Sequence, residues 1–159
     1  YTDGETVARR SVYFRHAYEK QMTMLVLFDA AGPNECYRRS ESIIPQQALT
    51  LANSALSLSE SRKLARTLWK EAEKKPDAEA TFVQVAFQQV LARSASASEA
   101  AACLSFLKQQ ATTLAEPASL TDFGGKASST VDASTDPTMR AKENMIHVLM
   151  NHNDFVTVR

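Results

Sequence analysis

The stretch PDAEATFVQVAFQQVLARSASASE, residues 76–99, carries the strongest helix signal in the chain. Pro76 and Asp77 are typical of a helix start, and five apolar residues then recur at i, i+3, i+4, i+7 and i+8. These residues are Val83, Ala86, Phe87, Val90 and Leu91. Ser96 and Glu99 match the S-x-x-E capping box that opens a second helix. The stretch therefore predicts a hairpin of two helices.

The flanking sequence extends the helical pattern in both directions. The second helix of the hairpin should run from 100 to 114 and bury Cys103, Leu104, Leu107, Ala111 and Leu114. Upstream, Pro45 starts a short helix that ends near Asn53, and a longer helix is expected over 57–74. Its buried side should hold Leu64, Ala65, Leu68 and Trp69, and its solvated side Arg62, Lys63, Arg66, Lys70, Glu71 and Glu73. Downstream, Asp136 and Pro137 start a helix that reaches about Asn151.

The remaining segments give weaker signals. Residues 1–16 alternate loosely and predict an extended arm or a short strand, whereas residues 18–28 fit a short helix or a strand equally well. Residues 116–136 are rich in Ser, Thr, Asp and Gly and predict a long polar loop. Gly124, Gly125 and Lys126 lie in that loop, but they lack the spacing of a phosphate-binding loop.

Composition sets the fold class. The chain has 159 residues, 44% of them hydrophobic, which suits one domain with an apolar core. Four glycines and five prolines are too few for a sheet-rich sandwich. We expect a mainly α, single-domain orthogonal helical bundle of about five or six helices, with the extended N-terminal arm and one long loop at 116–136.

Charge and hydropathy exclude several classes of protein. Eighteen basic and eighteen acidic residues balance, so no overall field favours nucleic acid. No apolar run approaches the roughly 20 residues that cross a bilayer. The start lacks a signal peptide and an initiator Met, and we interpret the chain as a piece of a longer protein. Cys36 and Cys103 have no metal or haem spacing and could form one disulfide or remain two buried thiols.

The densest group of special residues is FDAAGPNECYRRSESIIPQQALTLANS, residues 28–54. It combines a turn, a cysteine, two arginines and a helix start. Clustered polar residues of this kind often cap backbone groups, but arginines such as Arg38 and Arg39 also grip carboxylate, sulfate or phosphate groups with forked hydrogen bonds. The histidines His147 and His152 are five residues apart and so lie on different helix faces, which does not favour a metal site.

Five segments follow one another along the chain: RRSVY at 9–13, LFD at 27–29, ECYRRSES at 35–42, PQQALTLANS at 45–54 and NHNDF at 151–155. Taken together, this ordered set resembles a planctomycete-specific domain of unknown function. The resemblance implies the C-terminal part of a large exported protein of the periplasm or cell envelope, with haem carried by a separate cytochrome c domain and no cofactor in this chain. It assigns no catalytic residue. It favours a shared polar site, for which the candidates are Arg9, Arg10, Asp29, Arg38, Arg39 and Gln47.

Two functions remain open at this stage. The first is a non-catalytic helical module that docks against other domains of its parent protein. The second is a domain that binds or hydrolyses an anionic, sulfated or uronic polysaccharide, with Arg10, Arg38 and Arg39 as anion-binding groups and Asp29 or Glu35 as the acid/base candidate. Internal ion pairing of the arginines and an exposed apolar surface would favour the first function.

Overall fold

The regular elements of the chain are helices, which confirms the mainly α class. The computed structural model describes residues 10–14, 17, 19, 21–34, 45–116 and 129–156. Its elements are η1 (Ser11–Tyr13), α2 (Thr23–Leu27), α3 (Pro45–Asn53), α4 (Ala55–Ala72), α5 (Ala78–Leu91), α6 (Ala97–Ala115), α7 (Pro137–Met150) and α8 (Asn153–Val156). No strand occurs among the described residues. Of the two structures predicted for residues 18–28, a short helix or a strand, the helix is therefore correct and corresponds to α2.

The chain divides into two compact units, residues 1–54 and residues 55–159. The smaller unit contains η1, α2 and α3, and the larger unit contains α4 to α8. The expectation that both belong to one folding domain stays a prediction.

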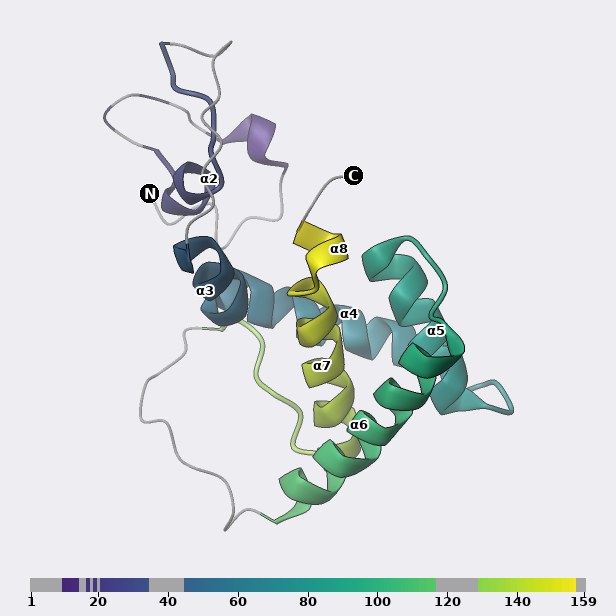
Figure 1. Ribbon diagram of the computed structural model, residues 1–159. Helices are drawn as coiled ribbons and strands as arrows, with labels where there is room; N and C mark the ends of the chain where they lie inside the picture. Colours follow the sequence, from purple (N-terminus) through teal and green to yellow (C-terminus); the bar gives the residue numbers. More distant parts are fainter. Residues whose placement is uncertain are drawn as a thin grey trace. The chain divides into compact units, whose positions relative to one another are not determined.

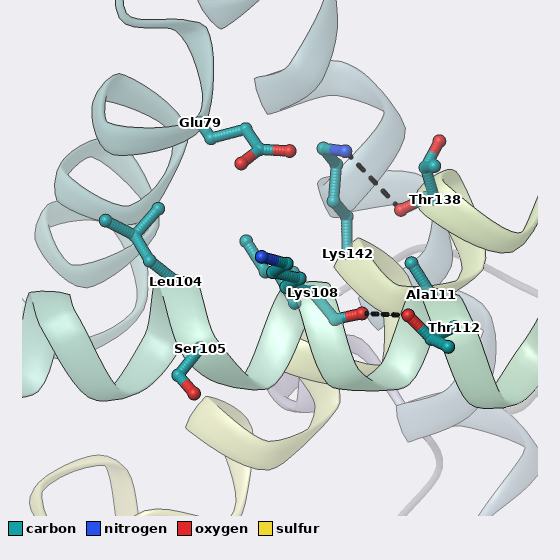
Figure 2. Close-up of a pocket in the computed structure, with 9 residues that line it drawn as sticks. Glu79, Leu104, Ser105, Lys108, Ala111, Thr112, Thr138 and Lys142 are labelled. Carbon is teal, nitrogen blue, oxygen red and sulfur yellow. Dashed lines mark hydrogen bonds between the residues drawn. The ribbon is translucent and has the colours of Figure 1, made fainter.

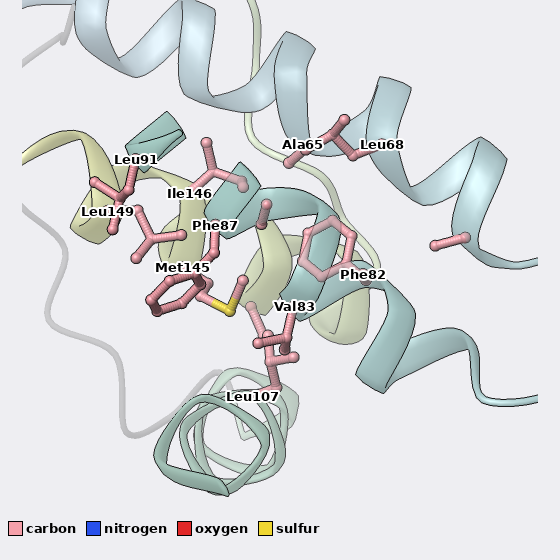
Figure 3. Packing of buried hydrophobic residues seen from close by; sticks show 13 residues of the cluster. Ala65, Leu68, Phe82, Val83, Phe87, Leu91, Leu107, Met145, Ile146 and Leu149 are labelled. Atoms are coloured by element: carbon pink, nitrogen blue, oxygen red, sulfur yellow. The ribbon is translucent and has the colours of Figure 1, made fainter. Parts of the chain in front are cut away.

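In the larger unit, α7 packs against both α4 and α6, and α5 packs against α4, α6 and α7 (Figure 1). The core lies where these four helices meet, and Figure 3 shows Phe82 and Val83 of α5 beside side chains of α4, α6 and α7. The buried apolar residues are Ala65, Leu68, Ala72, Phe82, Val83, Ala86, Phe87, Leu91, Leu107, Ala141, Met145, Ile146 and Leu149. The Trp69 ring meets Phe82 edge-on at a centroid distance of 6.0 Å.

Side-chain caps fix two helix starts in the larger unit. The Ser96 hydroxyl accepts a hydrogen bond from the Glu99 N–H, and the Glu99 carboxylate accepts one from the Ser96 N–H, which confirms the predicted capping box. The Asp136 carboxylate accepts hydrogen bonds from the N–H groups of Thr138 and Met139, and also from the Thr138 hydroxyl. The hydroxyl bond is the largest cause of a lowered Asp136 pKa, and the N–H bonds add to it. The helix α7 begins at its predicted start, and α6 begins three residues before the predicted residue 100.

The N-terminal arm departs from its prediction at one place. Ser11–Tyr13 form a 3-10 turn, while the flanking residues Arg10 and Phe14 have extended dihedral angles. Val12 and Tyr13 are 77% and 72% exposed, so the turn buries neither apolar side chain within the described structure. The alternation of apolar residues here therefore does not mark a strand.

Candidate functional site

The candidate polar site is described only in part. Arg9, Cys36, Arg38 and Arg39, like Glu35, lie outside the described residues. Arg10, Asp29 and Gln47 are described, and all three belong to the smaller unit. Arg10 is exposed and precedes η1. A convergence of all six candidates on one site stays a prediction.

Asp29 has a backbone role at the end of α2. Its φ angle of 54° lies in the left-handed region, where Asp is tolerated better than most residues. The Asp29 N–H donates to the Val26 carbonyl at 3.2 Å, and the Ala30 N–H donates to the Leu25 carbonyl at 2.9 Å. This pair of bonds is a Schellman motif, which satisfies carbonyls that the helix end would leave unpaired. The LFD segment therefore terminates α2 in the observed geometry.

Gln47 joins α2 to α3. Its side-chain Nε2 donates to the Leu27 carbonyl at 2.8 Å, another carbonyl of the last turn of α2. An open groove of about 530 Å³ lies along α3 and is lined by Leu27, Gln46, Leu49, Thr50, Asn53 and Ser54. We call it the α3 groove. Leu49 on its wall is 60% exposed, so the groove presents apolar surface to solvent.

A second pocket, of about 670 Å³, lies in the larger unit between α5, α6 and α7 (Figure 2). We call it the lysine pocket. Its charged lining residues are Glu79, Lys108 and Lys142, and Leu104, Leu107 and Ala111 supply apolar surface. Hydroxyl groups come from Ser105, Thr112 and Thr138. The volume is typical of a small-molecule site, roughly 300 to 1,000 Å³.

Lys142 is the unusual residue of the lysine pocket, because it is only 3% exposed. Its ammonium lies 4.0 Å from the centroid of the Trp69 ring, a cation–π distance, and donates to the Thr138 carbonyl at 3.4 Å. Burial lowers the Lys142 pKa, while the nearby Glu79 carboxylate opposes that shift. Sequence reasoning missed this residue, because a lysine on an amphipathic helix normally marks the solvated face.

A buried carboxylate, Glu143, connects three parts of the larger unit. Its Oε1 accepts from Arg66 Nε at 2.8 Å, and its Oε2 accepts from the Ser134 N–H at 3.0 Å. Arg66 also donates to the Asp132 carbonyl at 2.6 Å. One turn earlier on α4, Arg62 donates to the Ser129 hydroxyl and the Val131 carbonyl. Arg62 and Arg66 were expected on the solvated side of this helix, and the Arg66 side chain is 39% exposed, but both arginines also hold residues 129–134 against α4.

Arg93 forms a third polar cluster at the α5–α6 turn. Its guanidinium makes two hydrogen bonds to Glu99, at 3.0 and 2.7 Å, and one to Asp154 at 3.0 Å. These bonds raise the Arg93 pKa, and the Arg93 side chain in turn holds the Glu99 pKa well below its usual range. The cluster ties the turn to α8.

The cysteines and histidines considered in the sequence add no metal site in the described part of the chain. Cys103 is a half-buried free cysteine whose pKa is raised by burial, whereas Cys36 lies outside the described residues. His152 Nδ1 accepts a hydrogen bond from the Asp154 N–H. Among residues 10–34, 45–116 and 129–156, so far as they are described, no group of three potential metal ligands occurs. In the same part of the chain, no helix combines the length and apolar character needed to cross a membrane.

Comparison with known proteins gives one family. A family model described as "PSD1: Protein of unknown function (DUF1553)" matches residues 1–107, which is more than half of the chain. The match includes the smaller unit and the elements α4 and α5. No curated protein and no solved structure matches the chain.

Proposed function

The chain belongs to the PSD1 family of proteins of unknown function (DUF1553), and from this premise we propose that it is a non-catalytic helical interaction module of a large exported multidomain protein. Its partners are the other domains of that parent protein, one of which carries haem. Periplasmic or cell-envelope localisation is part of the same proposal.

The observation that carries this proposal is the α3 groove. Exposed apolar side chains that line a groove are typical of protein contact surfaces, because solvent exposure costs free energy that a partner recovers. Leu49 is 60% exposed on the groove wall, and Gln47 holds α3 to α2 through the Leu27 carbonyl. The groove is thus held in shape before a partner arrives, which lowers the entropic cost of docking.

Three arginines outside the candidate polar site are paired within the larger unit, whereas Arg38 and Arg39 lie outside the described residues and the internal pairing expected of them stays a prediction. Arg62, Arg66 and Arg93 donate their hydrogen bonds to groups of the same unit. Their guanidinium groups therefore stabilise the fold, and an anionic ligand would have to compete with partners already in place.

The test is a calorimetric titration of the 159-residue chain with the remainder of the parent protein. We expect binding that Leu49→Asp weakens at least about tenfold, because a charge would be buried in an apolar contact. Val148→Asp is the matched control, since Val148 is 57% exposed but belongs to the larger unit. No binding, or equal weakening by both variants, would contradict the proposal, and so would self-association of the chain through Leu49.

A second candidate function, binding of an anionic polysaccharide, is favoured by the exposed position of Arg10 beside η1. Arginine binds sulfate and carboxylate groups through forked hydrogen bonds. This candidate predicts that sulfated or uronic oligosaccharides raise the melting temperature and that Arg10→Gln reduces the shift. If the other parent domains raise the melting temperature and none of the oligosaccharides does, this second candidate function is excluded.

A further inference from the structure

Lys142 holds a buried positive charge with incomplete compensation. An ammonium group carries three N–H donors. Among the described residues, Lys142 Nζ donates to one carbonyl, that of Thr138, at the long distance of 3.4 Å, and lies over the Trp69 ring. It takes part in no ion pair with a described carboxylate within 4.0 Å. Buried ammonium groups are normally paired, because an unpaired charge loses its hydration.

The lysine pocket provides space for a missing anion. In Figure 2 the Lys142 amine and the Glu79 carboxylate face the same space, and Lys108 rises from α6 beside them. Two ammonium groups, Lys108 and Lys142, stand against two carboxylates, Glu79 in the lining and Asp136, which also acts on Lys142. Neither carboxylate forms an ion pair with Lys142 within 4.0 Å, so a monoanion can approach the Lys142 ammonium directly, whereas a dianion would meet more repulsion from Glu79.

The other walls of the pocket indicate what the anion is attached to. Leu104, Leu107 and Ala111 form an apolar surface on α6, and Thr112 and Thr138 place hydroxyl groups at the rim. The Thr112 hydroxyl already donates to the Lys108 carbonyl at 3.0 Å. Its donor is therefore used inside the helix, and the α6 wall favours an apolar ligand body over a hydroxylated one.

We propose that the lysine pocket binds a small carboxylate with an apolar body. The carboxylate accepts hydrogen bonds from Lys142 and Lys108, and the apolar body lies on Leu104, Leu107 and Ala111. This site lies within the larger unit and is independent of docking at the α3 groove.

The test is a ¹H–¹⁵N NMR titration of the full chain with hexanoate at pH 7. Hexanoate should perturb amides of α6 and α7 with a dissociation constant of about 1 mM, the affinity expected for so few ligand atoms. Hexanol has the same body without the charge and should bind at least about tenfold more weakly. Glucuronate has the charge with a hydroxylated body and should also bind more weakly.

Variants of the pocket distinguish recognition from general adsorption. Lys142→Met keeps most of the side-chain volume and should weaken hexanoate binding at least about tenfold, and Glu79→Gln should tighten it, because the repelling charge is removed. Lys70→Met, on the exposed side of α4, is the matched control and should bind like the wild type. If Lys142→Met fails to fold, Lys108→Gln serves instead, with weaker binding expected.

Three results would overturn the proposal. The first is that amide signals near the lysine pocket do not shift when hexanoate is present at 20 times its expected dissociation constant. The second is equal binding of hexanol and hexanoate. The third is stronger binding of glucuronate than of hexanoate. The last result would assign a uronic sugar in place of an apolar carboxylate.

Discussion

Glu143 is a buried carboxylate whose two oxygens are bound by two different parts of the larger unit. Its side chain is 2% exposed, whereas that of its partner Arg66 is 39% exposed. A buried carboxylate depends on its hydrogen bonds, because it cannot return to water without unfolding. Arg66 and the Ser134 N–H supply those bonds, so the loop segment and α4 are both held through one carboxylate.

Arg66→Ala should therefore destabilise the chain by about 3 kcal/mol, because it leaves the Glu143 charge buried and unpaired. Urea unfolding at pH 7 measures this change. The double variant Arg66→Met/Glu143→Leu should recover at least half of the loss, since it removes both charges. Lys63→Ala is the control, because the exposed Lys63–Glu60 pair should contribute less than about 0.5 kcal/mol. Equal losses for Arg66→Ala and Lys63→Ala would contradict the buried-pair account.

Ala92 is held in an unfavourable backbone conformation. It ends α5 with φ 54° and ψ 26°, a left-handed geometry that costs a residue with a Cβ about 1–2 kcal/mol. Ala92→Gly should raise stability by about 0.5–1 kcal/mol after the entropy of glycine in the unfolded chain is subtracted. Thermal melting should show a higher Tm. The same substitution at the exposed helical residue Ala101 should lower stability by about 1 kcal/mol, and two changes of equal sign would refute the conformational explanation.

Among the elements, the helix starts were the most predictable features. Pro45 begins α3, Pro137 begins α7, and Ser96 with Glu99 forms the capping box of α6. Each signal is local, because a cap or a proline acts within one turn. The contacts of Arg62 with residues 129 and 131 were not predictable, since they join positions more than sixty residues apart.

The Glu99 carboxylate should give the chain an acid-sensitive component of stability, because hydrogen bonds from Arg93 first, and then from Ser96 of the capping box, lower its pKa. The Glu99 pKa is lower in the folded chain than its unfolded value of about 4.3, so its contribution is present above that value and is lost as pH falls through the folded pKa. The stability difference between wild type and Glu99→Gln should therefore shrink between pH 6 and pH 2.5 in urea titrations. Glu60→Gln should show a much smaller change. A stability difference between wild type and Glu99→Gln that does not change with pH would contradict this prediction.

At the scale of the whole molecule, the sequence predicted the helical class but not the grouping of helices. Apolar periodicity identifies which face of a helix is buried, but not which helix covers it. Asp29 and Gln47 were expected in a shared polar site, and that site stays a prediction, while the hydrogen bonds of the Asp29 N–H and of Gln47 Nε2 lie at the end of α2. Lys142 was missed because its surroundings come from α4 and α7 together.

The larger unit should fold without the smaller one. All of the buried apolar residues that the structure describes lie within residues 55–159, so a fragment of this range keeps that core together. We expect one cooperative thermal transition and dispersed NMR signals from it. A fragment without a cooperative transition would show that residues 1–54 are required, which would favour a single folding domain for the complete chain.

The central claim is that the α3 groove is a docking surface for the parent protein. Hydrogen exchange measured by mass spectrometry tests it directly, by comparing the 159-residue chain alone with the same chain inside the intact parent. The account predicts slower exchange over α2 and α3 in the parent, centred on residues 45–54, with little change along α6. Equal exchange over residues 45–54 in both samples would contradict it.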